Sequence, residues 1–114
     1  MIISDLYASI FRFCDDFKVK QEALGRALSV VNFDAHADEA NLPQGDLIGI
    51  SGFSATTSTF TSVTVMFGIC TQDDTNLFRL VAMISEVYES LKPTSVHTVY
   101  DSSTGNARGI MNVV

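Results

Sequence analysis

Two histidines are the side chains best suited to acid–base or metal chemistry near neutral pH, and they lie far apart in the chain. His36 stands in an acidic run with Asp34, Asp38 and Glu39, and imidazole with carboxylates can bind a divalent metal ion. A solvated polar loop explains the same run without a metal, and we favour that interpretation. His97 alternates with valines on an expected strand, which is typical of a surface histidine or of one satisfied within the sheet, not of a general base.

Two cysteines, Cys14 and Cys70, each lie inside an apolar pattern. The sequence allows a disulfide between them, but two reduced, buried thiols fit this sequence better. There is no CxxC motif and no cluster of cysteines with histidines, so we expect no zinc site. A nucleophilic Cys14 would need a basic partner, and its place in the apolar stripe of a helix favours a role in the core.

Two pairs of adjacent aspartates, Asp15-Asp16 and Asp73-Asp74, are the other candidates for catalysis. General acid–base catalysis needs two carboxyl groups across a pocket, whereas neighbouring side chains on a helix point apart. The start of a helix explains Asp73-Asp74, and a solvated helix edge explains Asp15-Asp16. P-loop, dinucleotide-binding and nucleophile-elbow motifs are absent. We therefore predict no catalytic residues, cofactor-binding residues, metal ligands or cofactors, and we expect that the chain is not an enzyme.

The composition is that of one small acidic domain. The chain has 114 residues, a net charge of −6, 46% apolar residues and 18% charged residues. We take residues 1–114 as a single domain with a packed core. The mean hydropathy of +0.24 is high for this size, so either the core is large or a partner covers apolar surface.

Charge and hydropathy also exclude classes of partner. The seven basic residues are scattered, whereas phosphate binding needs clustered ones, so we expect neither tight nucleic-acid binding nor attachment to an anionic membrane. A negative surface instead repels DNA that passes close by. No run of about 18 apolar residues is present, and the N-terminus lacks the basic region of a signal peptide. We expect a mature, soluble chain that is made in a cytoplasm.

Hydrophobic periodicity predicts two helices and five strands. Ser4 and Gly25 are the expected N-cap and C-cap of the first helix, and Asp74 or Thr75 is the expected N-cap of the second. Residues 34–45 are expected to form a long surface loop. The predicted elements are helix 4–17, extending as far as 24; strands 27–33, 46–54 and 59–71; helix 77–91; and a hairpin of 95–100 with 108–114.

This order, α-β-β-β-α-β-β, predicts an α+β fold: an antiparallel or mixed sheet with two amphipathic helices packed on one face. A Thr/Ser-rich turn is expected at residues 55–58, a bulge or a close backbone approach at Gly49 and Gly52, and the C-terminal arm within the sheet.

The long strand 59–71 has two unlike faces. One is strongly apolar and is expected to meet the helices, and the other is mixed, which suits solvent or another subunit. Phe60 and Phe67 cannot share a face, nor can Phe11 and Phe13 point the same way on a helix. One or two aromatic rings therefore reach the surface, either as an anchor for a subunit contact or as a ring without a partner.

The chain resembles the tail terminator (tail completion) proteins of long-tailed bacteriophages. The resemblance covers nearly the whole chain and rests on the order and character of its elements, not on a signature motif. Its points of likeness are Asn41-Leu42-Pro43 and Asp46-Leu47-Ile48-Gly49-Ile50 around the second strand, Val63-Thr64-Val65-Met66-Phe67-Gly68-Ile69 in the central strand, and Asp73-Asp74-Thr75-Asn76 at the second helix.

The resemblance implies a structural protein of the virion that forms a ring, a hexamer, on the head-proximal end of the tail tube. Such a ring ends tube polymerisation and joins the tube to the head or neck. Its implied partners are further copies of itself, the tail tube protein and head–tail connector or neck proteins, with DNA only as cargo in the channel and no membrane. The implied location is the virion tail or neck, after synthesis in the host cytoplasm. Sheet edges and residues 34–46 are expected to contact neighbouring subunits.

Other interpretations stand beside this one. A different ring protein of the neck or tail would have the same features. A small acidic binding or inhibitory module, such as a phage-encoded protein that blocks a host factor, would be favoured by carboxylates gathered on one face, whereas here they are dispersed in the sequence. A small enzyme or ligand-binding domain would need a pocket with convergent polar groups.

Overall fold

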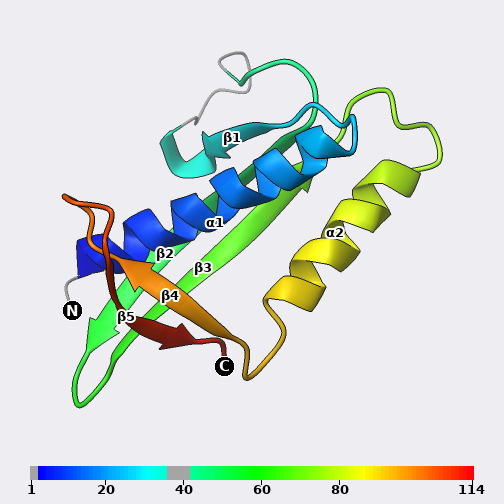
Figure 1. Cartoon of the computed structure of the whole chain (residues 1–114). Helices are drawn as coiled ribbons and strands as arrows, with labels where there is room; N and C mark the ends of the chain where they lie inside the picture. The colour runs from blue at the N-terminus through cyan, green and yellow to red at the C-terminus, as the bar shows by residue number, and fades with distance from the viewer. Residues whose placement is uncertain (1–2, 36–41) are drawn as a thin grey trace.

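The computed structural model describes residues 3–35 and 42–114, and its elements follow the predicted order (Figure 1). The fold is α+β, as the sequence predicts. The elements are α1 (Ile3–Ala23), β1 (Ser29–Asn32), the 3-10 turn η1 (Phe33–Ala35), β2 (Leu47–Thr57), β3 (Thr61–Cys70), α2 (Phe78–Ser90), β4 (Val96–Tyr100) and β5 (Ala107–Asn112).

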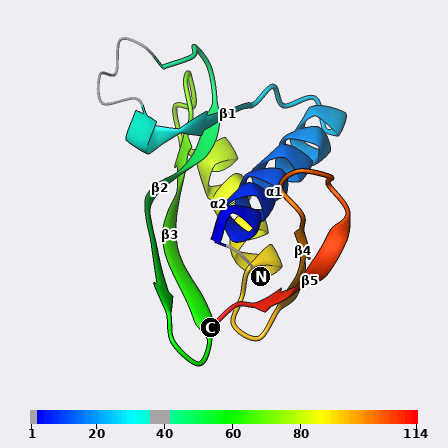
Figure 2. The ribbon, with the colours of Figure 1, turned by 90° about the vertical axis from the view of Figure 1, so that its left-hand side faces the viewer.

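The described residues form two separate sheets. In the first, β2 lies between β1, which runs parallel to it, and β3, which runs antiparallel, so this sheet is mixed. Both helices lie on one face of it, and the β4–β5 hairpin lies on the far side of the helix layer (Figure 2). The prediction that the C-terminal arm joins the main sheet is wrong, because β4 packs on α1 instead.

Polar contacts fix that hairpin to α1. The hydroxyl of Ser9 accepts a hydrogen bond from the backbone N–H of Tyr100 at 2.8 Å. The buried carboxylate of Asp5 accepts from the N–H of Ser102 at 2.9 Å and pairs with Arg108 at 3.0 Å. A helix side chain thus satisfies a strand N–H that another strand would otherwise bind.

The core lies between the helices and the mixed sheet. Apolar residues at helical spacing on α1 meet alternate residues of β2, as expected for an amphipathic helix on a sheet. The buried cluster comprises Ile10, Cys14, Phe17, Leu28, Ile48, Ile50, Met83 and Val87.

The two ends of α1 differ in how well the sequence predicts them. Ser4 lies inside the helix, which begins at Ile3, so its predicted role as N-cap is wrong. The predicted C-cap is confirmed: Gly25 has φ +79°, its N–H donates to the carbonyl of Glu22, and that of Arg26 donates to the carbonyl of Gln21. This pair of bonds is a Schellman motif, which needs a residue in the left-handed conformation.

β2 extends further than predicted, whereas β3 is shorter than its predicted range of 59–71. Residues 55–57, expected in a turn, continue β2 and pair with Val63, Ser62 and Thr61, because threonine favours extended backbone. Both alternatives predicted for the strand glycines are present, a bulge at Gly52 and a close backbone approach at Gly49. Gly52 has φ +64° where the register shifts, and a Cβ on Gly49 would lie 2.1 Å from the carbonyl oxygen of Val31.

Candidate functional site

His97 lies on β4 and is half-buried. Its ring meets that of Phe13 edge-on, with 6.0 Å between the centroids, and its Nε2 lies 3.3 Å from the hydroxyl of Ser95. An imidazole with an aromatic neighbour and a hydroxyl partner is satisfied within the structure, which agrees with the interpretation from the strand pattern.

The acidic run around His36 lies mostly outside the described residues, and this includes His36, Asp38 and Glu39. Asp34 is described, and its carboxylate accepts a hydrogen bond from the N–H of Gly52 at 2.9 Å. Across residues 3–35 and 42–114, no group of three His, Cys, Asp or Glu side chains could hold a metal ion. Asp34 therefore has a structural task, which is to tie η1 to the bulge in β2.

The two cysteines are free and differ in environment. Cys14 is fully buried, and burial together with the nearby charge of Asp15 raises the pKa of its thiol to about 12. Such a thiol stays protonated near neutral pH and is a poor nucleophile. Cys70 is exposed on β3, so the prediction that both thiols are buried is wrong for Cys70, which lies on the open face of an edge strand.

The aspartate pairs do not face one another across a pocket. Asp15 and Asp16 are exposed on α1, and Asp73 is exposed ahead of α2. Asp74 instead closes the start of α2: its carboxylate accepts from the backbone N–H groups of Arg79 at 3.3 Å and Leu80 at 2.9 Å. Burial opposes its ionisation, but these hydrogen bonds outweigh that effect and lower the pKa of Asp74.

The N-cap of α2 is thus not where the sequence places it. The residue at the N-cap position is Leu77, with φ 57° and no side-chain capping bond. Asp74 accepts hydrogen bonds from two first-turn amides, as a capping residue does, but it lies outside the helix and not at the N-cap position.

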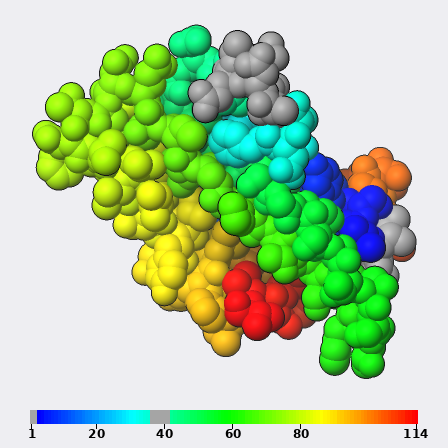
Figure 3. Space-filling model, turned by 180° about the vertical axis from the view of Figure 1, so that it is seen from behind, coloured from blue at the N-terminus to red at the C-terminus, as the bar shows by residue number. Residues whose placement is uncertain are grey.

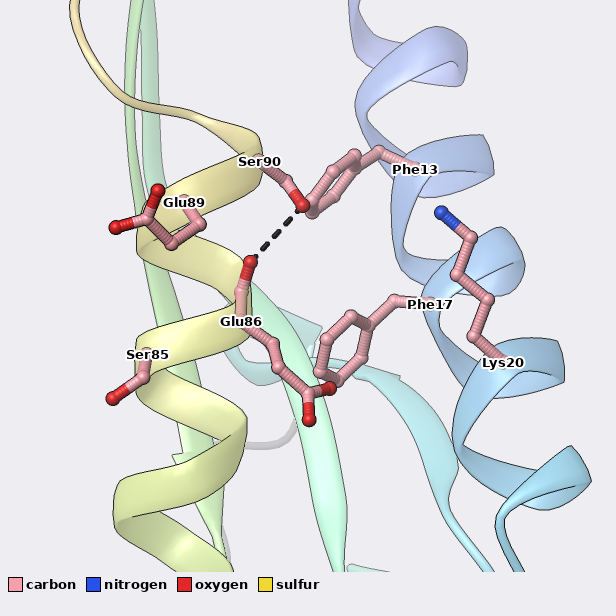
Figure 4. Close-up of a pocket in the computed structure, with 7 residues that line it drawn as sticks. All are labelled: Phe13, Phe17, Lys20, Ser85, Glu86, Glu89 and Ser90. Carbon is pink, nitrogen blue, oxygen red and sulfur yellow. Dashed lines mark hydrogen bonds between the residues drawn. The ribbon is translucent and has the colours of Figure 1, made fainter.

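A cleft of about 380 Å³ separates α1 from α2 (Figure 4). Glu86 on its α2 side accepts a hydrogen bond from the buried amide of Gln21 and pairs with Arg26 at 3.4 Å. These contacts join the two helices, so the carboxylate is already engaged. The cleft is lined by Phe13, Phe17, Lys20, Ser85, Glu86, Glu89 and Ser90.

The most distinctive surface is on the opposite side of α2. Its apolar side chains form two stripes, and only the one that contains Met83 and Val87 is buried. The second stripe is between 50% and 77% exposed, and we call it the α2 apolar face; it comprises Leu77, Phe78, Val81, Ile84 and Tyr88. At about 100° of rotation per residue, most of it points away from Glu86 and therefore away from α1. Contiguous apolar exposure of this kind marks an interaction site.

The α2 apolar face adjoins an open sheet edge. Among the described residues β3 pairs only with β2, so its other edge carries unpaired backbone groups, and α2 contacts β3 (Figures 1 and 3). Residues 47–72, which span the whole hairpin, contain no charged side chain. Two exposed apolar residues lie on it: Phe60 at the tip and Met66 on β3, at 78% and 66% exposure. The charges that usually protect an edge strand from pairing are thus absent here.

One ion pair holds these two features together. Arg79, in the first turn of α2, donates from Nη2 to Oδ1 of Asp46 at 3.1 Å and from Nε to Oδ2. Asp46 also accepts from the N–H of Gln72 at 3.0 Å, just after β3. The hydrogen bond from Arg79 is the main reason that the pKa of Asp46 is lowered, and burial opposes it only in part. The network fixes where α2 lies relative to β3.

Sequence reasoning missed this surface because it treated the apolar residues of α2 as one stripe. Val87 is buried in the core and Leu91 packs against it, whereas Val81, Ile84 and Tyr88 are exposed. The apolar arc of α2 is wider than one packed face needs, and this width is the feature of the sequence that indicates a second, exposed stripe. Phe67 packs against the core and Phe60 is exposed, but Phe60 lies at the hairpin tip ahead of β3, so the predicted alternation of the two rings along one strand does not apply to it.

No described helix is long and apolar enough to cross a membrane. No protein-family model matches this chain, and neither the curated proteins nor the solved structures contain a significant match to it.

Proposed function

We propose that this protein is a structural subunit of a phage virion that assembles into a ring, caps the tail tube, ends its polymerisation and joins it to the head or neck. The α2 apolar face beside the unpaired edge of β3 is the observation that carries the proposal. It is a surface for another polypeptide, because it offers apolar side chains and unpaired backbone groups together.

Two further features support the proposal. The element order α-β-β-β-α-β-β, on which the resemblance to tail terminator proteins rests, is the order of the fold. The net charge of −6 suits a subunit that lines a channel for DNA, because a negative wall does not hold the passing phosphates. The proposed ring is a hexamer, which is the ring size that the resemblance to tail terminator proteins implies.

The test is the state of assembly of the purified full chain. Multi-angle light scattering over a range of concentrations, with negative-stain imaging of the same samples, is expected to show a closed ring with six subunits. Assembly is also expected to be promoted by purified tail tube protein if the free subunit is weakly associated. A strict monomer at high concentration, still monomeric with tail tube protein present, would overturn the proposal.

A further inference from the structure

The α2 apolar face and the open edge of β3 need a partner that supplies apolar side chains and a free strand edge at once. The same chain carries such a segment. Within the described residues β5 pairs only with β4, so its other edge is open too. The β4–β5 hairpin therefore supplies the free strand edge, on β5, and the paired strand β4 keeps β5 rigid.

The side of that hairpin opposite Val99 supplies the apolar side chains. Val99 is fully buried and His97 contacts Phe13, so these alternate residues of β4 face α1. The outer side, which we call the hairpin outer face, comprises Val96, Thr98, Ile110 and Asn112. Thr98 is paired with Ile110, and Val96 with Asn112, which places each pair on the same side. Val96 and Ile110 are 58% and 64% exposed, and no residue of this face is charged.

We infer that the hairpin outer face of one copy packs on the α2 apolar face of the next, with its β5 edge alongside the open edge of β3. This inference rests on the proposed function, since it names the contact through which the ring would form. The added strand would extend the mixed sheet beyond β3, on the side to which Val81, Ile84 and Tyr88 point. Both apolar faces and both open edges are covered by this one contact.

A symmetric contact between two α2 helices is the main competitor, and it fits less well. It would cover the α2 apolar face but leave the hairpin outer face and both strand edges exposed. It would also close as a dimer, because a two-fold contact uses the same surface on both subunits. The two faces proposed here lie on different elements at different places in the fold, so their contact is heterologous and repeats from copy to copy, as a ring requires (Figures 1 and 2).

Cysteine cross-linking between copies tests the contact. In a Cys70→Ser background, Ile84→Cys and Ile110→Cys are made in separate chains, mixed and treated with a short bismaleimide. The remaining cysteine, Cys14, is fully buried. Each variant alone is expected to stay uncrosslinked, and the mixture is expected to give a dimer whose linked peptides contain positions 84 and 110. Val19→Cys, at an apolar position of α1 that is 65% exposed, is the matched control and should not link to Ile110→Cys.

The other outcomes separate this inference from the proposed function. A dimer from Ile84→Cys alone would show the symmetric contact and overturn the inference. Rings or larger assemblies in light scattering, with no link between positions 84 and 110 above the Val19→Cys control, would also overturn it while the proposed function stands. A strict monomer under all conditions, with tail tube protein included, would overturn both.

Discussion

The guanidinium of Arg79 donates two hydrogen bonds to the carboxylate of Asp46, one from Nε and one from Nη2. This pair joins the first turn of α2 to the start of β2, and Asp46 is 9% exposed. It matters for function because the position of α2 beside β3 creates the proposed contact surface. Its loss should therefore affect both stability and assembly.

The variant Asp46→Asn should lower the free energy of unfolding by roughly 1–3 kcal/mol, because it leaves a cationic partner poorly paired in a partly buried site. The pKa of Asp46 is lowered in the fold, so its contribution to stability is present above the unfolded pKa, near 3.8, and is lost as pH falls through the folded pKa. Urea unfolding between about pH 6 and pH 2 should show a shallower loss of stability in Asp46→Asn than in the wild type. Asp16→Asn, on the exposed edge of α1, should follow the wild-type curve. Parallel curves for Asp46→Asn and the wild type would contradict the role assigned to this pair.

Asp74 should protect the start of α2, although it lies outside the helix. Asp74→Ala removes the acceptor for the backbone N–H groups of Arg79 and Leu80, so both amides should exchange with deuterium at least several-fold faster. Thr75→Ala is the control, because Thr75 is the other N-cap candidate in the sequence and is exposed. Equal exchange rates in the two variants would rule out capping by Asp74.

Gly49 should be intolerant of any side chain. A Cβ there would meet the backbone oxygen of Val31 at 2.1 Å, and backbone atoms of a paired strand cannot move aside. Gly49→Ala is expected to cost roughly 3 kcal/mol or more, at the upper end for overpacking. At Gly68 the nearest atom, at 3.0 Å, belongs to the ring of Phe33, so Gly68→Ala should cost less, about 1 kcal/mol. Thermal or urea unfolding of both variants decides this order, and a larger loss in Gly68→Ala would contradict it.

The two cysteines should react at very different rates. Cys70 is exposed, whereas Cys14 is buried with a pKa raised to about 12. At about pH 8, near the ordinary pKa of a thiol, a thiol reagent should label Cys70 in the native protein, and should label Cys14 only after unfolding. Cys70→Ser should abolish native labelling, and mass spectrometry of digested protein identifies the labelled site. Rapid native labelling of Cys14 would show that the core around it opens.

The α2 apolar face should control assembly with little effect on folding. Ile84→Asp places a charge at a position that is 50% exposed, so the free energy of unfolding should change by less than about 1 kcal/mol. Assembly should be lost at concentrations where the wild type assembles, because an unpaired carboxylate would be buried in the contact. Val19→Asp introduces the same charge at an exposed apolar position outside both faces and should leave assembly intact. Light scattering and circular dichroism of the two variants give the comparison, and equal assembly would exclude this face from the contact.

The sequence by itself determined the elements and their order. Periodicity located both helices and all five strands of the described residues, Gly25 marked the end of α1, and alternation placed Phe67 on the face of β3 that meets the core. Each of these depends on backbone geometry within one element, so a local pattern is sufficient. The same local signals misplaced the N-cap of α1 at Ser4, which lies inside the helix, and the N-cap of α2, whose first-turn amides are bound by a residue outside the helix.

Tertiary structure alone decided which apolar residues are buried. Nothing local distinguishes Val87, which faces the core, from Ile84, which does not, since both belong to one wide apolar arc. Whether each is buried depends on where α1 and the sheet contact α2. The long-range ion pair of Asp46 with Arg79 fixes the position of α2. The separation of the terminal hairpin from the main sheet has the same origin, because Ser9 and Asp5 bind it from a helix near the other end of the chain. The candidate surface therefore arises from packing between distant segments, and for this reason the sequence predicted contacts at the sheet edges and residues 34–46 but not the exposed apolar face of α2.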